Sequence, residues 1–150
     1  MLPRNTPALD SKKGLTRCFG CGPDNPIGLK LNFDWDGQTA SATFIPGEWH
    51  EGWPGIVHGG IVSVVLDEAM TYVPYFKGIH CVTGRLEVRL KGHIKAGETF
   101  KVNAESTRLT RKLMECKSTL IRDDGQTVAE GKALYYIVTH WDLPGGAVSR

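Results

Sequence analysis

Residues 58–70 read HGGIVSVVLDEAM, and this stretch decides how the rest of the chain is interpreted. Its apolar run is long and lacks the strict alternation of a half-buried strand, so we predict a helix that begins at Gly59 and ends at Pro74. Apolar residues fall on every side of this helix, at positions 61, 62, 64, 65, 66, 69, 70 and 73. A helix that is apolar all round is buried, so we expect it at the centre of the fold.

Two carboxylates interrupt this apolar helix, at Asp67 and Glu68. A carboxylate that leaves water without a partner destabilises the fold or becomes protonated. One of two adjacent side chains can point outwards, and we expect this for Glu68, in an ion pair or a solvent-facing stripe. Asp67 is then the candidate functional acid.

Strand-like segments flank the helix on both sides. Before it, two runs are separated by Asp36-Gly37, a dipeptide typical of tight hairpins. After it, Leu86, Val88 and Leu90 alternate with charged residues, which predicts a strand with one buried face. The predicted strands are 29–35, 39–45, 85–91, 99–109, 112–122 and 127–139, the last two joined by a turn at 123–125. This order predicts an α+β fold, in which one antiparallel sheet of five to six strands wraps around the long central helix.

Size and composition exclude several classes of protein. The chain has 150 residues, of which 41% are hydrophobic and 23% charged, as expected for one ordinary globular domain. A formal net charge of +2 is too small to indicate nucleic-acid binding. No apolar run approaches the length of a membrane span, and residues 1–17 lack the apolar block of a secretory signal, so we expect a cytoplasmic protein with no membrane partner.

The N-terminal region is rich in turn-forming residues. Residues 1–28 hold four prolines and are predicted to form an arm or loop, followed by one domain at 29–140 and a tail at 141–150. Cys18 and Cys21 have the spacing of half a zinc site, but structural zinc needs four ligands and no second pair follows. We therefore expect small thiols packed in a turn and no metal.

The first residues of the helix, His58-Gly59-Gly60, are a second candidate feature. Unpaired backbone N–H groups and the positive end of the helix dipole lie here, and glycines let an oxygen atom approach them, although the glycines could equally serve only a tight turn. Gly60 and Asp67 are seven residues apart, which is about 10 Å along a helix axis, so one carbonyl group cannot touch both. Two chains with antiparallel helices about a two-fold axis would bring these groups together in two equivalent sites.

The same stretch resembles the signature of hotdog-fold acyl-CoA thioesterases of the phenylacetic-acid-degradation (PaaI-type) group. Three further segments are similar to that group: CFGCGPDNPIGLKL at 18–31, GWPGIVHGG at 52–60 and VTGRLEVRLKGHIKAGE at 82–98. The resemblance covers about residues 18–139. It implies a hotdog fold that hydrolyses an acyl-CoA to a free acid and coenzyme A without a metal or prosthetic group. It also implies a homodimer or a dimer of dimers with shared sites.

The resemblance also implies roles for individual residues. Asp67 corresponds to the general base or nucleophile, and Gly59 to the backbone N–H that polarises the thioester carbonyl. Thr83 falls where the family often has Ser or Thr holding the attacking water. Strict alternation puts Thr83 on the same strand face as Arg85, so it reaches the site only if that face meets the pocket or a local bulge intervenes.

One family feature is missing from this sequence. Relatives commonly have Asn or Gln about six residues before the histidine of the HGG motif, where this chain has His50-Glu51-Gly52, so His50 or Glu51 would have to substitute. The expected substrate-binding residues are His58, Gly60, His50, Glu68 and Arg85, the last of these for the phosphates of coenzyme A.

Two alternative functions stay open at this stage. The missing loop amide is compatible with a non-catalytic acyl-CoA-binding or regulatory protein that keeps the fold and the pocket. An enoyl-thioester hydratase on the same fold would also use a buried acid, normally together with a histidine on or near the helix, and His58 is the only candidate for that role.

Overall fold

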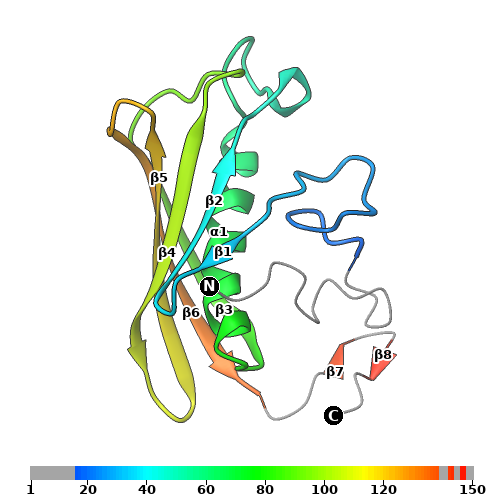
Figure 1. Ribbon diagram of the computed structural model, residues 1–150, viewed down its shortest axis with the longest axis vertical. Helices are drawn as coiled ribbons and strands as arrows, with labels where there is room; N and C mark the ends of the chain where they lie inside the picture. Colours follow the sequence, from blue (N-terminus) through cyan, green and yellow to red (C-terminus); the bar gives the residue numbers. More distant parts are fainter. Residues whose placement is uncertain (1–15, 139–141, 144–145, 148–150) are drawn as a thin grey trace.

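A six-stranded antiparallel sheet packs against one helix in the computed structural model, which describes residues 16–138, 142–143 and 146–147 (Figure 1). The elements are β1 Asp34–Trp35, β2 Thr39–Phe44, the 3₁₀ turn η3 Glu48–His50, α1 Gly59–Phe76, β3 Cys81–Leu90, β4 Phe100–Leu109, β5 Leu113–Arg122, β6 Thr127–Ile137, β7 Asp142–Leu143 and β8 Gly146–Ala147. The strand order is β1-β2-β4-β5-β6-β3, and β7 pairs separately with β8. This arrangement confirms the predicted α+β hotdog fold. The predicted boundaries at 28 and 140 stay predictions.

The helix is longer at its C-terminus than predicted. It continues through Pro74 to Phe76, so the prediction that Pro74 ends it is wrong. Proline already has a helical φ, and a proline in the last turn removes only one backbone hydrogen bond. Pro74 is itself buried, and its carbonyl accepts a hydrogen bond of 2.9 Å from the N–H of Ile79. Burial and this bond offset the missing donor.

Both predicted hairpin turns are present. At the β1–β2 turn, Asp36 Oδ1 accepts the backbone N–H groups of Gln38 and Thr39, and Gly37 has a φ of +98°. At the β5–β6 turn, Gly125 has a φ of +86°. A positive φ is readily available to glycine, which explains why these positions end one strand and start the next.

The predicted strand at 29–35 is only partly a strand. Its last two residues form β1, but earlier backbone groups bond to the arm instead: Leu29 N–H donates to Phe19 O at 2.8 Å and Leu31 N–H to Gly20 O at 2.9 Å. These bonds fold the segment 18–31 back on itself, with the side chain of Leu31 buried. The arm is thereby held against the body of the domain.

Strand β3 lies at one edge of the sheet, beyond β6. Its alternation is as predicted, because Leu86, Val88 and Leu90 pair with the helix-facing residues of β6. The predicted burial is wrong for a single chain, since Leu86 is 39% exposed and Leu90 is 52% exposed. An edge strand has a neighbour on one side only, so its inward side chains are only partly covered.

Candidate active site

Asp67 is the least satisfied carboxylate of the central helix. Its Oδ1 atom is buried and has no hydrogen-bond partner among the residues that the structure describes. Burial raises the pKa of this carboxyl above its usual range. One turn further along, the Thr71 hydroxyl lies 3.2 Å from the Tyr135 hydroxyl of β6. Because residues i and i+4 share a helix face, Asp67 lies on the flank of α1 that faces β6.

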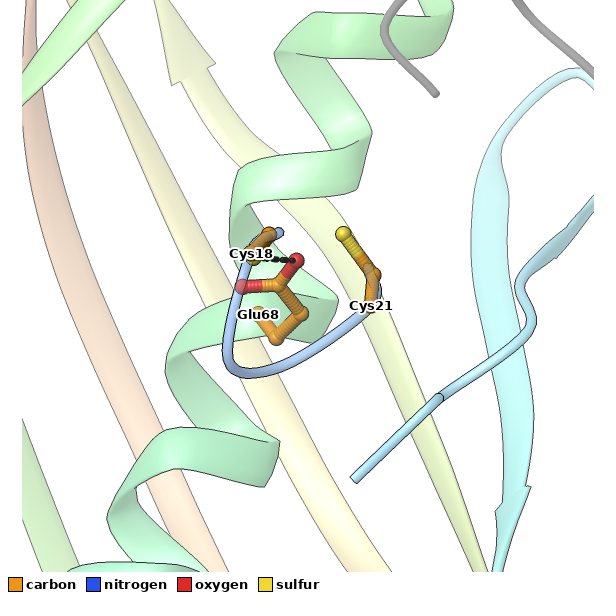
Figure 2. A group of neighbouring side chains, drawn as sticks. All are labelled: Cys18, Cys21 and Glu68. Carbon is orange, nitrogen blue, oxygen red and sulfur yellow. Dashed lines mark hydrogen bonds between the residues drawn. The ribbon is translucent and has the colours of Figure 1, made fainter. Parts of the chain in front are cut away.

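Glu68 points to a different neighbour, the N-terminal arm (Figure 2). The Cys18 thiol donates a hydrogen bond of 3.4 Å to its Oε1 atom, and a Cβ atom on Gly20 would lie only 2.7 Å from the carboxyl group. Burial raises the pKa of Glu68 to about 8. The expected solvent-facing or ion-paired role is therefore wrong: the arm encloses Glu68, and within the described residues no ion pair reaches it.

The start of the helix distinguishes the two candidate glycine donors. The Gly60 N–H donates to His58 Nδ1 at 2.9 Å, and the N–H groups of Ile61 and Val62 donate to the His58 carbonyl at 3.0 and 3.2 Å. The Gly59 N–H has no such bond to any described residue. Of the amides that open α1, Gly59 therefore presents the available donor.

The loop that stands in place of the family's Asn or Gln lies beside this helix start. The His50 carbonyl accepts the N–H of His58 at 2.8 Å, and His50 Nδ1 accepts the N–H of Gly47 at 2.9 Å. The Nδ1 atoms of His50 and His58 thus both serve local backbone turns. Glu51 is exposed and forms a β-bridge with Val57.

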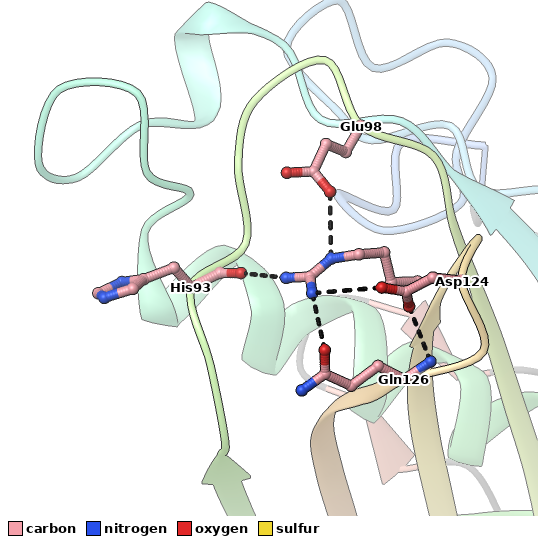
Figure 3. A network of polar contacts seen from close by, with 5 residues as sticks. His93, Glu98, Asp124 and Gln126 are labelled. Atoms are coloured by element: carbon pink, nitrogen blue, oxygen red, sulfur yellow. Dashed lines mark hydrogen bonds and ion pairs between the residues drawn. The ribbon is translucent and has the colours of Figure 1, made fainter.

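A half-buried arginine holds the segment that leads into the helix (Figure 3). The Arg122 guanidinium donates to the His93 carbonyl at 2.7 Å and pairs with the Glu98 carboxylate at 3.1 Å. The loop between these two residues bonds to residues 55–57, through Val57 N–H to Ile94 O at 2.8 Å. Arg122 therefore helps to position the HGG turn, although it is far from that turn in the sequence.

A β-bulge at Gly84 resolves the position of Thr83. Thr83 pairs with Tyr135 and Arg85 pairs with Leu134, so Gly84 is the extra residue. Tyr135 is buried on the helix side of the sheet, and directly opposed residues share a face. Thr83 therefore faces the same side as the helix.

Because of the same bulge, Arg85 lies on the face of the sheet that points away from the helix. Arg85 forms a 3.5 Å ion pair with Glu87, and both line a hollow on the outer face of the sheet together with Lys117 and Lys132. Within one chain, Arg85 lies across the sheet from Asp67. The predicted contact of Arg85 with substrate finds no support in this placement.

One chain does not bring the main candidates together. Gly59 and Asp67 are eight residues apart on α1, which corresponds to about 12 Å along the axis. His50, His58, Gly59 and Gly60 gather at the helix start, whereas Asp67 and Thr83 belong to the flank near β6 and β3. The arm over Glu68 was not predictable from spacing alone, because Cys18 and Glu68 are 50 residues apart.

Comparison with known proteins identifies the family. A family model described as the thioesterase superfamily matches residues 54–129, just over half of the chain. The chain belongs to the thioesterase superfamily. No curated protein matches the sequence. Within the described residues, no helix is both long and apolar enough to cross a membrane.

Solved structures agree with this assignment. The PaaI protein of Escherichia coli is 17% identical, with a TM-score of 0.68 over 72% of this chain and 83% of that chain. A hypothetical thioesterase from Streptococcus pneumoniae, solved with coenzyme A, is 14% identical, with a TM-score of 0.66 over 71% of this chain and 86% of that chain. A thioesterase superfamily protein named RHA08564 is 19% identical, with a TM-score of 0.73, and there the match covers 77% of this chain and 61% of the longer relative. These likenesses confirm the PaaI-type hotdog fold.

Proposed function

We propose that this chain hydrolyses the thioester bond of an acyl-CoA, with Asp67 as general base or nucleophile. The observation that carries this proposal is the buried Oδ1 atom of Asp67, which lacks a partner among the described residues of a thioesterase-superfamily chain. An unpartnered buried carboxylate destabilises a fold, and catalysis is one reason for such a group to persist. The coenzyme A in the Streptococcus pneumoniae structure supports a coenzyme A thioester as the substrate class.

The proposed electrophilic group is the Gly59 N–H. A thioester carbonyl gains negative charge on oxygen in the transition state, and one fixed N–H donor is worth about 3–4 kcal/mol against that charge. Gly60 cannot supply this donor while its N–H is bonded to His58 Nδ1. Thr83, on the helix side of β3, is the proposed residue that holds the attacking water.

The proposed active site is shared between two chains. The separation of about 12 Å between Gly59 and Asp67 rules out simultaneous contact with one carbonyl group in one chain. Strand β3 offers a surface for association, because it is a sheet edge ten residues long with Leu86 and Leu90 exposed. We therefore propose that the protein forms a homodimer or a dimer of dimers. We also propose that it is located in the cytoplasm.

Release of free thiol from acyl-CoAs tests the proposed reaction. The wild-type protein is expected to release coenzyme A from at least one member of a panel of aliphatic and aromatic acyl-CoAs. Asp67→Ala and Asp67→Asn are expected to abolish that release. Binding without thiol release would instead indicate an acyl-CoA-binding protein, and hydration of an enoyl-CoA without thiol release would indicate a hydratase.

A further inference from the structure

Three potential metal ligands meet where the arm crosses the central helix. Figure 2 shows Cys18 and Cys21 on either side of the Glu68 carboxylate. One ligand atom from each of these residues lies within 4.8 Å of the other two. Among the described residues, this is the one such group of His, Cys, Asp or Glu side chains.

The spacing suits a tetrahedral zinc ion. With Zn–S bonds of about 2.3 Å and Zn–O bonds of about 2.0 Å, the tetrahedral angle places a sulfur and an oxygen ligand about 3.5 Å apart. Cys18 Sγ and Glu68 Oε1 are 3.4 Å apart. All three ligand atoms lie within 4.8 Å of one another, so short side-chain movements would bring them to bonding distance of one ion.

The charges around the cluster favour a cation. Cys18 and Cys21 lie within 4.8 Å of Glu68, and Asp67 precedes Glu68 on α1; each of these side chains can carry only a negative charge. No basic side chain in the described part of the chain is paired with them. Ionised thiols and carboxylates placed this close repel one another, whereas a divalent cation would compensate the charge of all three.

The backbone of the arm holds the two cysteines in a tight turn. The Gly22 N–H donates to the Cys18 carbonyl at 2.8 Å, which closes the turn between the two cysteines. A side chain on Gly22 would collide with the backbone of Cys18, and one on Gly20 would press on Glu68. The hydroxyl of Tyr72, one helical turn after Glu68, interacts with the Cys21 thiol. In metal sites such neighbours orient the ligands.

We propose that Cys18, Cys21 and Glu68 form a binding site for a zinc ion that fastens the arm to the central helix. Paired thiolates select thiophilic cations, and a carboxylate oxygen is an accepted third ligand of zinc. The two thiols and the Glu68 carboxyl group release the protons that they hold to solvent as the ion binds. A water molecule would complete the tetrahedron. The site lies one residue from Asp67, so the ion would hold the helix and arm in register beside the candidate active site.

Zinc binding to the reduced full-length chain tests the site directly. Protein stripped with a chelator, kept under a phosphine reductant and titrated with zinc is expected to bind one ion per chain. Cobalt in place of zinc is expected to show sulfur-to-metal charge-transfer absorption, which requires thiolate ligands. Neither measurement depends on thioester hydrolysis. Absence of zinc binding would therefore leave the proposed function intact, and absence of hydrolysis would leave the proposed zinc site intact.

Matched variants identify the ligands. Cys18→Ala, Cys21→Ala and Glu68→Gln are each expected to weaken zinc binding by more than about 100-fold, since removal even of an outer neighbour costs 10–100-fold. The controls are Cys81→Ala, whose thiol lies outside the cluster, and Glu87→Gln, whose carboxylate is exposed; both are expected to bind zinc like the wild type. Circular dichroism of each variant checks that the fold is retained, and the conservative Glu68→Gln keeps the test valid if an alanine variant unfolds.

Two results would overturn the site. The first is a reduced wild-type chain that takes up no zinc. This result would overturn the site even if Cys18 and Cys21 form a disulfide when the chain is oxidised. Zinc binding that survives all three ligand substitutions would also overturn it.

Discussion

Replacing Asp67 by alanine is expected to stabilise the protein while abolishing its activity. A buried acceptor without a partner costs about 1–3 kcal/mol, and because Asp67 as a whole is only half-buried we take the lower end, about 1 kcal/mol. Alanine also has a higher helix propensity than aspartate, by about 0.5 kcal/mol. For a chain of 150 residues, each kcal/mol corresponds to about 2–4 °C in Tm, so we expect a rise of about 3–6 °C.

Thermal unfolding and thiol release, measured on the same preparation at one protein concentration, check this prediction. Asp123→Ala is the matched control, because Asp123 is exposed at the β5–β6 turn and its removal should change stability by less than about 0.5 kcal/mol. The control should also keep full activity. A fall in Tm for Asp67→Ala would show that the carboxylate has a stabilising partner, and retained activity would remove Asp67 from the proposed mechanism.

Three further predictions concern Thr83, the shared site and the bulge at Gly84. Thr83→Ala should slow turnover by about fivefold, the equivalent of about 1 kcal/mol for a lost contact to water, and an unchanged kcat would leave Thr83 a purely structural residue. Mixing Asp67→Ala chains with Gly59→Pro chains, each inactive alone, should restore about one working site per mixed dimer; verified mixed dimers without activity would exclude the shared site. Gly84→Val should lower the free energy of unfolding by about 1–3 kcal/mol, because the new side chain collides with the ring of Tyr136, whereas Gly92→Ala, with nothing within 4 Å of its added Cβ, should have little effect on Tm.

Local patterns predicted most of the fold. The apolar run after Gly59 and the glycine turns at 37 and 125 depend on neighbours in sequence, so their structural meaning can be judged without knowing the rest of the chain. Pro74 shows the limit of this approach. A proline is a helix breaker by local rules, but Pro74 is buried and α1 continues for two more residues.

The contacts of Glu68 could not be predicted from such local patterns. Its partner Cys18 is 50 residues away, and the two meet only because the arm folds back through the bonds of Leu29 and Leu31. The bulge at Gly84 is a similar case. Strict alternation predicted that Thr83 lies on the same face as Arg85. One extra residue in β3, Gly84, shifts the alternation so that the two side chains lie on opposite faces, and the glycine is the only local sign of the bulge.

The edge strand β3 connects the sequence pattern to the proposed assembly. Its period of two encodes one apolar face, yet Leu86 and Leu90 are 39% and 52% exposed in a single chain. The outer side of the same strand has no neighbouring strand in the sheet. An apolar row beside free backbone donors and acceptors is a surface that another copy of the chain can cover through a two-fold interface. The exposed edge and the separation of about 12 Å between Gly59 and Asp67 are independent observations, and association of two chains accounts for both.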